Sequence, residues 1–388
     1  MQNSNLYSEV MSVNLFDNEI FDYPLLVKIA ALISLIALAF IIITLLIIYF
    51  NRIKTAARKK NEKIAERVIV KELSERFLIY NTIREIPEDE LTYAVNKLKE
   101  LKNTSLVFRK TLVKILVHFK RNLNGAIVEI INSAYLWLGL REFSLSKLKS
   151  RWWFTRTEGL VELKEMNDID SLSEISGLMK DSNIDVRVTA YSALIKLKAN
   201  NSFSFLREET SQLSEWHQIF LLDVIGKVPD LVIAELGPYL ETKNNSIVLF
   251  CLKVIIHYKQ FGAIPAMINM LDHEDEQVRN QLINALGLLN AEEAEEKLIE
   301  IYSGEHNKNK SQILTALGNI SSGVSLDFIK EKFLKADHYI LLKSAAEAIV
   351  SHSNELKKDA IASLPNLDDE QKAMLKHFEE PLNLYGIH

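Results

Sequence analysis

A helical repeat of about 31 residues constrains the fold of this chain more than any other feature of its sequence. The stretch 186–197 has apolar residues at helical spacing, with small residues that allow close helix contact. We take Ala193 as its reference position. The equivalent positions in the following helices are Val224, Val254, Ala285, Ala316 and Ala348, which gives steps of 31, 30, 31, 31 and 32 residues. Leu or Ile follows every reference position, and the residue three before it is always apolar.

Each period also contains a second apolar stretch, as at 172–179 and 263–271. Short polar turns, such as 181–183 and 272–275, separate the two stretches. Each unit is therefore predicted to be a pair of helices. Because one pair cannot bury its own apolar face, stacked pairs are expected, and they form an all-α solenoid.

Two stretches resemble a known repeat family: D-V-R-V-T-A-Y-S-A-L at 185–194 and E-Q-V-R-N-Q-L-I-N-A-L-G at 276–287. They are similar to the HEAT-repeat superfamily, in particular its short PBS-lyase-like repeats. The resemblance is clear from 150 to 355 and weaker from 80 to 150. It implies an α-solenoid, but not one particular function, because such repeats serve many unrelated tasks.

A long apolar run, residues 25–50, precedes the repeats and contains a single charge, Lys28, near its start. As a helix it would be about 39 Å long at about 1.5 Å per residue. That length exceeds a hydrocarbon core of about 30 Å, so the sequence predicts a tilted membrane span. A cleaved signal peptide needs a basic leader and a shorter apolar run, whereas residues 1–24 contain no Lys or Arg.

The flanking charges predict the orientation of this span. The basic residues just after it include Arg52, Lys54, Arg58, Lys59 and Lys60, which we also considered as contacts to the membrane surface. The positive-inside rule places this side in the cytoplasm of an inner membrane. We therefore expect an extracytoplasmic segment 1–24, a transmembrane helix 25–50, a basic juxtamembrane helix 51–80, a solenoid 81–355 and a capping helix with a tail at 356–388.

The composition and motifs argue against several functional classes. The net charge of −5 gives no reason to expect nucleic-acid binding. The single cysteine, Cys251, excludes an intramolecular disulfide and a multi-cysteine zinc site. The nucleotide-binding and hydrolase motifs that we sought do not occur. Deoxyhypusine hydroxylase-like proteins hold two irons with several His-Glu pairs, but only His273-Glu274 has that order here. We therefore expect no catalytic residues, no metal and no cofactor.

Two neighbouring repeats carry aromatic residues where the others carry mostly polar ones. The positions four before, one before and three after the reference should face solvent on the second helices. The predicted partner-binding set combines aromatic and basic residues: Trp216, Phe220, Phe250, Lys227, Lys253 and His257. Aromatic anchors with charged rims suit a protein-binding hot spot. The alternative is that both Phe rings are buried between repeats.

A second cluster combines tryptophans with basic residues: Lys147, Lys149, Arg151, Trp152, Trp153, Phe154 and Arg156. It suits a membrane interface or an acidic partner. The repeat pattern also fits Trp152, Trp153, Gly159, Leu160 and Leu163, with Trp152 at an apolar core position. Core packing is therefore expected for Trp152, whereas Trp153 is left open.

These features favour a non-enzymatic scaffold that is held at the cytoplasmic membrane face and binds a protein partner. A membrane enzyme complex, such as a glycosyltransferase or an export system, is one kind of client for such a scaffold. Two alternatives remain at this point. One is a HEAT-like enzyme that depends on a metal or a tetrapyrrole. The other is a module that binds lipid surfaces through the stretches 51–63 and 147–156.

Overall fold

The computed structural model describes residues 24–76, 79–80, 85–125, 127–200, 202–365 and 367–379. These residues form helices, turns and loops, and no strand occurs among them. The chain divides into two compact units, Met1–Leu140 and Arg141–His388, here called unit 1 and unit 2. The all-α prediction is confirmed.

Unit 1 is built around one very long helix, α1 (Leu25–Arg76), which packs against α2 (Glu88–Thr104) and α3 (Leu106–Asn122). A fourth helix, α4 (Ile127–Trp137), contacts α3. The C-terminal half of α1 buries Ala65, Ile69 and Leu73. Their spacing of four residues places them on one side of the helix, which is the side that docks.

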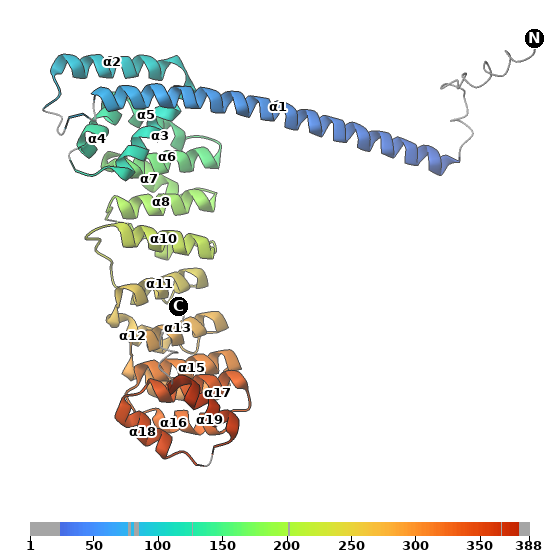
Figure 1. The fold of residues 1–388 in the computed structure, drawn as a ribbon, viewed down its shortest axis with the longest axis vertical. Helices are drawn as coiled ribbons and strands as arrows, with labels where there is room; N and C mark the ends of the chain where they lie inside the picture. Colours follow the sequence, from blue (N-terminus) through green and yellow to red (C-terminus); the bar gives the residue numbers. More distant parts are fainter. Residues whose placement is uncertain are drawn as a thin grey trace, which may run out of the picture. The chain divides into compact units, whose positions relative to one another are not determined.

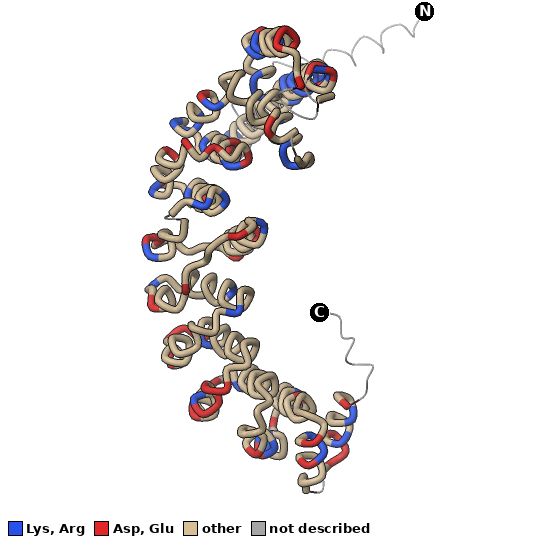
Figure 2. The backbone as a smooth tube through the Cα atoms, turned by 90° about the vertical axis from the view of Figure 1, so that its left-hand side faces the viewer, with Lys and Arg blue, Asp and Glu red and all other residues tan. Residues whose placement is uncertain are grey.

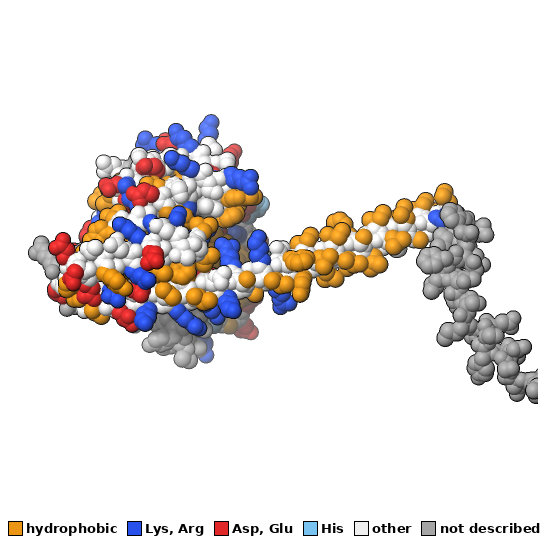
Figure 3. All heavy atoms as spheres, turned by 90° about the horizontal axis from the view of Figure 1, so that it is seen from above, with side chains coloured by type: hydrophobic (Ala, Val, Ile, Leu, Met, Phe, Trp, Pro, Cys, Tyr) orange, Lys and Arg blue, Asp and Glu red, His pale blue; other side chains and the backbone are white. Residues whose placement is uncertain are grey.

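The N-terminal half of α1 is long and apolar enough to cross a membrane. Its leucine and isoleucine side chains are exposed. Figure 3 shows orange hydrophobic side chains along the face of this half that is in view. The five basic residues considered for membrane-surface contact, Arg52, Lys54, Arg58, Lys59 and Lys60, follow on the same helix and are exposed.

Unit 2 is a stack of helix pairs, and consecutive long helices contact one another (Figure 1). The long helices are α6 (Trp153–Glu165), α8 (Ile184–Lys196), α10 (Glu215–Lys227), α11 (Asn245–Tyr258), α13 (Glu276–Leu288), α15 (Asn307–Ile320) and α17 (Tyr339–Ser351). Figure 2 shows the helices nearly end-on, in two columns. The shorter helices are α5 (Leu140–Leu148), α7 (Leu172–Gly177), α9 (Phe205–Glu208), α12 (Ile264–Asn269), α14 (Glu295–Ile301), α16 (Leu326–Leu334), α18 (Asn354–Ala362) and α19 (Asp369–Glu379).

The repeat predicted from the sequence is confirmed by burial. All six reference positions, from Ala193 to Ala348, are buried, and so are the residues that follow them and those three before. They belong to one continuous apolar core that runs through unit 2. Each long helix therefore stabilises its neighbours, and the core grows one repeat at a time.

Local sequence signals set the ends of these helices. Asn183, Ser214, Asn244 and Asp275 are N-caps whose side chains accept hydrogen bonds from backbone N–H groups of the first turn. Residues in the left-handed conformation follow several of the C-termini: Asn167, Lys198, Lys259, Asn290 and Ser321. This conformation turns the chain out of the helix and toward the next short element.

Candidate partner-binding surface

The stack is least regular between α10 and α11. Residues 231–236, which follow the left-handed Asp230 at the end of α10, have no regular structure. The glycine two residues after a reference position shows how closely consecutive long helices approach each other. A Cβ added to Gly287 or Gly318 would lie within 3 Å of the next long helix, but one added to Gly226 of α10 would meet nothing within 4 Å. Thus α10 and α11 do not approach backbone to backbone there.

Helix α10 carries an exposed apolar stripe made of Trp216, Ile219 and Phe220, here called the α10 stripe. Their side chains are 80%, 47% and 37% exposed. Their spacing of three and four residues places them on one helix face. Leu221 and Ile225, on the other side of the helix, are buried in the core, and Val224, one turn after Phe220, is buried at the edge of the stripe. The position of the stripe is therefore fixed.

The corresponding positions of a regular repeat are polar. In α13 the residues eight, five and four before the reference are Gln277, Asn280 and Gln281. Trp216, Ile219 and Phe220 occupy the same positions relative to Val224. The stripe is therefore a local departure from the repeat pattern, and the core does not require it.

Three lysines contact residues of α10, and one of them contacts Phe220 of the stripe. The Lys164 Nζ lies 5.2 Å from the centre of the Phe220 ring and 3.3 Å from the Ser192 Oγ. The Lys253 Nζ donates a hydrogen bond of 2.9 Å to the Gln218 Oε1. Lys227 forms an exposed 2.7 Å ion pair with Asp223 one turn away.

His257, the remaining predicted rim residue, is exposed on α11. Its ring meets Tyr258 edge to face, with 4.8 Å between the ring centres. The structure thus joins Trp216 and Phe220 on one helix. It adds Ile219, five before the reference, which lies outside the three positions that the repeat pattern assigns to solvent.

The prediction that Phe250 projects into solvent is wrong. Its side chain is 0% exposed, and its ring lies 6.1 Å from that of Phe205. Phe205 in turn stacks on Tyr191 at 4.4 Å. Helix α11 is apolar on nearly every side from Ile247 to Leu252, which is the pattern of a buried helix and was a signal in the sequence.

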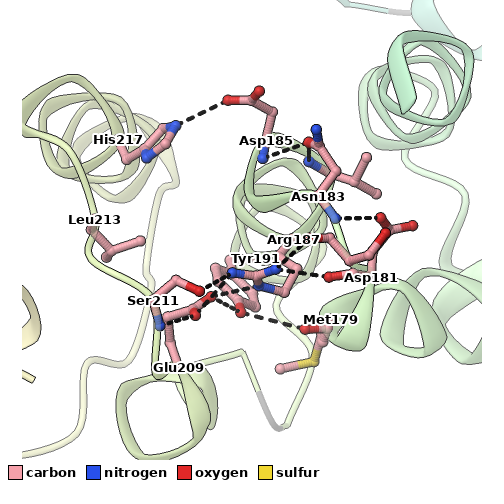
Figure 4. A network of polar contacts seen from close by, with 12 residues as sticks. Met179, Asp181, Asn183, Asp185, Arg187, Tyr191, Glu209, Ser211, Leu213 and His217 are labelled. Atoms are coloured by element: carbon pink, nitrogen blue, oxygen red, sulfur yellow. Dashed lines mark hydrogen bonds and ion pairs between the residues drawn. The ribbon is translucent and has the colours of Figure 1, made fainter. Parts of the chain in front are cut away.

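An arginine-carboxylate network ties neighbouring repeats together near α10 (Figure 4). Arg187 donates to both carboxylate oxygens of Glu209, at 2.8 and 3.1 Å, and to the backbone oxygen of Asp181 at 2.8 Å. The Tyr191 hydroxyl donates to Glu209 at 2.8 Å. His217 of α10 reaches Asp185 of α8 at 3.1 Å.

This network changes the pKa values of its buried members. Burial alone would raise the pKa of Glu209. The hydrogen bonds from Arg187, the Ser211 backbone and Tyr191 outweigh burial and hold it below its ordinary value. Burial, together with the bond to Glu209, raises the pKa of Tyr191. At neutral pH the network therefore contains a carboxylate and a neutral phenol.

Equivalent arginines occur in other repeats, and their contacts correct the repeat register that the sequence suggested for α6. Arg279 bonds to Glu305 at 3.0 Å and to the backbone oxygen of His273 at 2.8 Å. Arg156 pairs with Asp181 at 2.7 Å and donates to the Ser150 backbone oxygen at 2.8 Å. Arg156 is therefore the equivalent of Arg187, one period earlier.

This register places Trp152 at the N-cap of α6, where α8 has Asn183. The prediction that Trp152 packs in the core is therefore wrong. Its side chain is 52% exposed, and Trp153 and Phe154 beside it are 44% and 53% exposed. Gly159, Leu160 and Leu163 are buried, in agreement with the pattern.

An open cleft of about 660 Å³ is lined by residues of 198–208 and 230–239, on either side of α10 in the sequence. The Arg207 guanidinium lies 5.0 Å from the centre of the Tyr239 ring at its wall. The cleft was not anticipated, because it depends on the irregular segment after α10.

Cys251 and His273, the other two potentially reactive residues in the sequence, have structural roles. Cys251 is buried, and burial raises the pKa of its thiol to about 12, so the thiol stays protonated. The His273 Nδ1 accepts a hydrogen bond from the Asp275 N–H within a turn. Among the residues described, no three His, Cys, Asp or Glu side chains are grouped so that they could hold a metal ion.

The family model for HEAT repeats matches residues 264–350. No curated protein matches the sequence. Among solved structures, an engineered protein is similar, with 13% identity and a TM-score of 0.36, covering 84% of this chain and 95% of that chain.

Two further solved structures are similar. Human deoxyhypusine hydroxylase has 12% identity and a TM-score of 0.29, covering 77% of this chain and 99% of its own. The complex of CpcE and CpcF of phycocyanin lyase from Nostoc has 14% identity and a TM-score of 0.25, covering 69% of this chain and 94% of its own. At these scores the likenesses carry no conclusion about activity.

Proposed function

Because residues 264–350 are HEAT repeats and the same helix pair recurs through unit 2, we propose that this protein is a membrane-anchored scaffold that binds a protein partner through the α10 stripe. The observation that carries the proposal is the exposure of Trp216, Ile219 and Phe220 on a helix whose other face is buried. Rigid aromatic and aliphatic groups of this kind dominate protein-binding hot spots.

The partner is expected to offer an apolar segment with acidic neighbours. Lys227, Lys253 and His257 lie on α10 and α11 and provide a basic rim, in which Lys227 is already partly neutralised by Asp223. Such a rim favours an acidic partner mainly through faster association and specificity, whereas the apolar stripe supplies most of the affinity.

The anchor in this proposal is the apolar half of α1. The basic residues that follow residue 50 support a cytoplasmic location of unit 2 in this proposal, by the positive-inside rule. A partner at the inner membrane, such as a component of a glycosyltransferase or an export system, would then lie within reach. The scaffold itself carries out no reaction in this proposal.

The test compares alanine variants of the full-length protein in its native membrane. Trp216→Ala and Phe220→Ala truncate the stripe, and Tyr339→Ala truncates an exposed aromatic residue at the start of α17 as a matched control. Crosslinking mass spectrometry would report the partners of each variant, and the melting temperature would report folding. Loss of the same partner from both stripe variants, with unchanged melting and with the partner retained by Tyr339→Ala, supports the proposal. Retention of all partners by the stripe variants would overturn it.

A further inference from the structure

Three consecutive aromatic residues, Trp152, Trp153 and Phe154, are exposed where α6 begins. The Trp152 and Phe154 rings stack with 5.9 Å between centres, and Trp153 meets Phe154 edge to face at 6.1 Å. They form one continuous apolar surface, here called the α6 patch. We propose that the α6 patch inserts into the interface of an anionic lipid bilayer.

The patch is held in place before any ligand binds. Arg156 donates to the Ser150 backbone oxygen at 2.8 Å and forms an ion pair with Asp181, which lies in the turn before α8. The Ser150 hydroxyl accepts a hydrogen bond from the Trp152 N–H at 3.2 Å. The loop before α6 is thus fixed from both sides, so presenting the three rings costs little conformational entropy.

Two exposed cations adjoin the patch in the sequence. Lys149 and Arg151 are exposed, and the Arg151 guanidinium lies 4.7 Å from the centre of a Trp152 ring. Lys147 does not contribute, because it is buried and paired with Glu158 at 2.9 Å. An exposed cation next to indole rings matches an anionic headgroup above an acyl-chain boundary.

A bilayer fits these rings better than a protein groove does. Indole rings prefer the boundary between headgroups and acyl chains, because they are apolar with one N–H donor. The patch lies at a loop and a helix start, so its rings project together into one surface. The inference rests on the proposed membrane anchoring, since a tethered unit 2 meets the bilayer at high effective concentration.

Tryptophan fluorescence of the full-length protein tests the inference. The chain has four tryptophans, Trp137, Trp152, Trp153 and Trp216. The double variant Trp137→Phe with Trp216→Phe leaves only the two indoles of the patch. It is added to vesicles of phosphatidylcholine and phosphatidylglycerol with or without brominated acyl chains, which quench only indoles that they touch. Extraction at alkaline pH reports in the same sample whether α1 has inserted.

Quenching of the double variant by brominated lipid, with a blue shift of its emission, supports the α6 patch as a lipid contact. Insertion without quenching overturns the patch and leaves the anchor intact. Quenching without insertion supports the patch and overturns the proposed anchor. Absence of both overturns both. If lipid does not quench the patch, its exposed rings would instead favour a protein partner.

Two further variants sharpen this outcome. A chain with Trp216 as its only tryptophan reports the α10 stripe in the same assay. If Trp216 were quenched as strongly as the patch, the α10 stripe would contact lipid, which would contradict the protein partner proposed for it. Charge reversal at the two exposed cations, Lys149→Glu with Arg151→Glu, should reduce quenching in anionic vesicles. Unchanged quenching in anionic vesicles would overturn the anionic-lipid assignment.

Discussion

Gly318 of α15 lies so close to Ala348 of α17 that a Cβ added to the glycine would be 2.6 Å from the Ala348 Cα. Gly287 of α13 stands in the same relation to Ala316, at 2.7 Å. In both cases the glycine is two residues after one reference position and faces the next one. The C-terminal repeats therefore pack backbone against backbone, which only the smallest residues allow.

Gly318→Ala is expected to lower the melting temperature of unit 2. The added methyl group must push α15 and α17 apart, and such overpacking costs about 1–3 kcal/mol. This cost exceeds the gain of up to about 1 kcal/mol from the better helix propensity of alanine. Gly226→Ala is the matched control, because its Cβ meets no atom within 4 Å and should leave stability unchanged or raise it. Equal effects of the two substitutions would contradict the close packing.

Phe250→Ala and Phe220→Ala should separate a core ring from a surface ring. Truncating the buried Phe250 leaves a cavity beside Phe205 and is expected to cost about 3–5 kcal/mol. Phe220 is more than a third exposed, so its truncation should cost well under half of that. Thermal unfolding of the two variants, followed by circular dichroism, measures the difference. A larger loss for Phe220 would mean that the surface was assigned wrongly.

The fold was predictable because the sequence encodes burial periodically. The reference positions follow one another at steps of 30 to 32 residues. An insertion or deletion of one residue in one repeat therefore leaves the pattern in the other repeats visible. The repeat register of α6 was predicted wrongly. Trp152 satisfied an apolar position of the pattern, whereas Arg156, a full period of 31 residues before Arg187, was the more specific signal.

The binding surface was only partly predictable, because helix rotation depends on the neighbours of each helix. Trp216 and Phe220 are exposed as expected, and Phe250 is not, although the same rule was applied to both repeats. The difference arises because the Phe250 ring of α11 packs near Phe205 of α9, in the preceding repeat. No period in the sequence encodes that contact.

The orientation of α1 gives a prediction about topology. Basic residues follow the apolar half of α1, and acidic residues without Lys or Arg precede it. A reporter that is active only in the cytoplasm, fused after residue 388, should therefore be active. A reporter that works only outside the cytoplasm, fused at the same place, should be silent. The reverse pair of results would place unit 2 outside and exclude a cytoplasmic client.

Glu209 gives a prediction about the pH dependence of stability. Its pKa is held below the ordinary 4.5, since the hydrogen bonds from Arg187, the Ser211 backbone and Tyr191 outweigh its burial. A carboxyl group with a lowered pKa stabilises the folded state above the ordinary value. That contribution is lost as pH falls through the lowered pKa. Glu209→Gln should therefore cost about 1.5–3 kcal/mol at pH 7, the range for hydrogen bonds to charged groups.

The melting temperatures of the original protein and of Glu209→Gln should differ by a constant amount from pH 7 down to about 4.5 and converge below it. Glu208→Gln makes the same change of charge at an exposed neighbour and serves as the control. It should follow the original protein at every pH, because an exposed carboxylate contributes little to stability. A Glu209→Gln difference that persists unchanged well below the ordinary pKa would mean that shape, and not the charge on Glu209, holds α8 to the segment before α10.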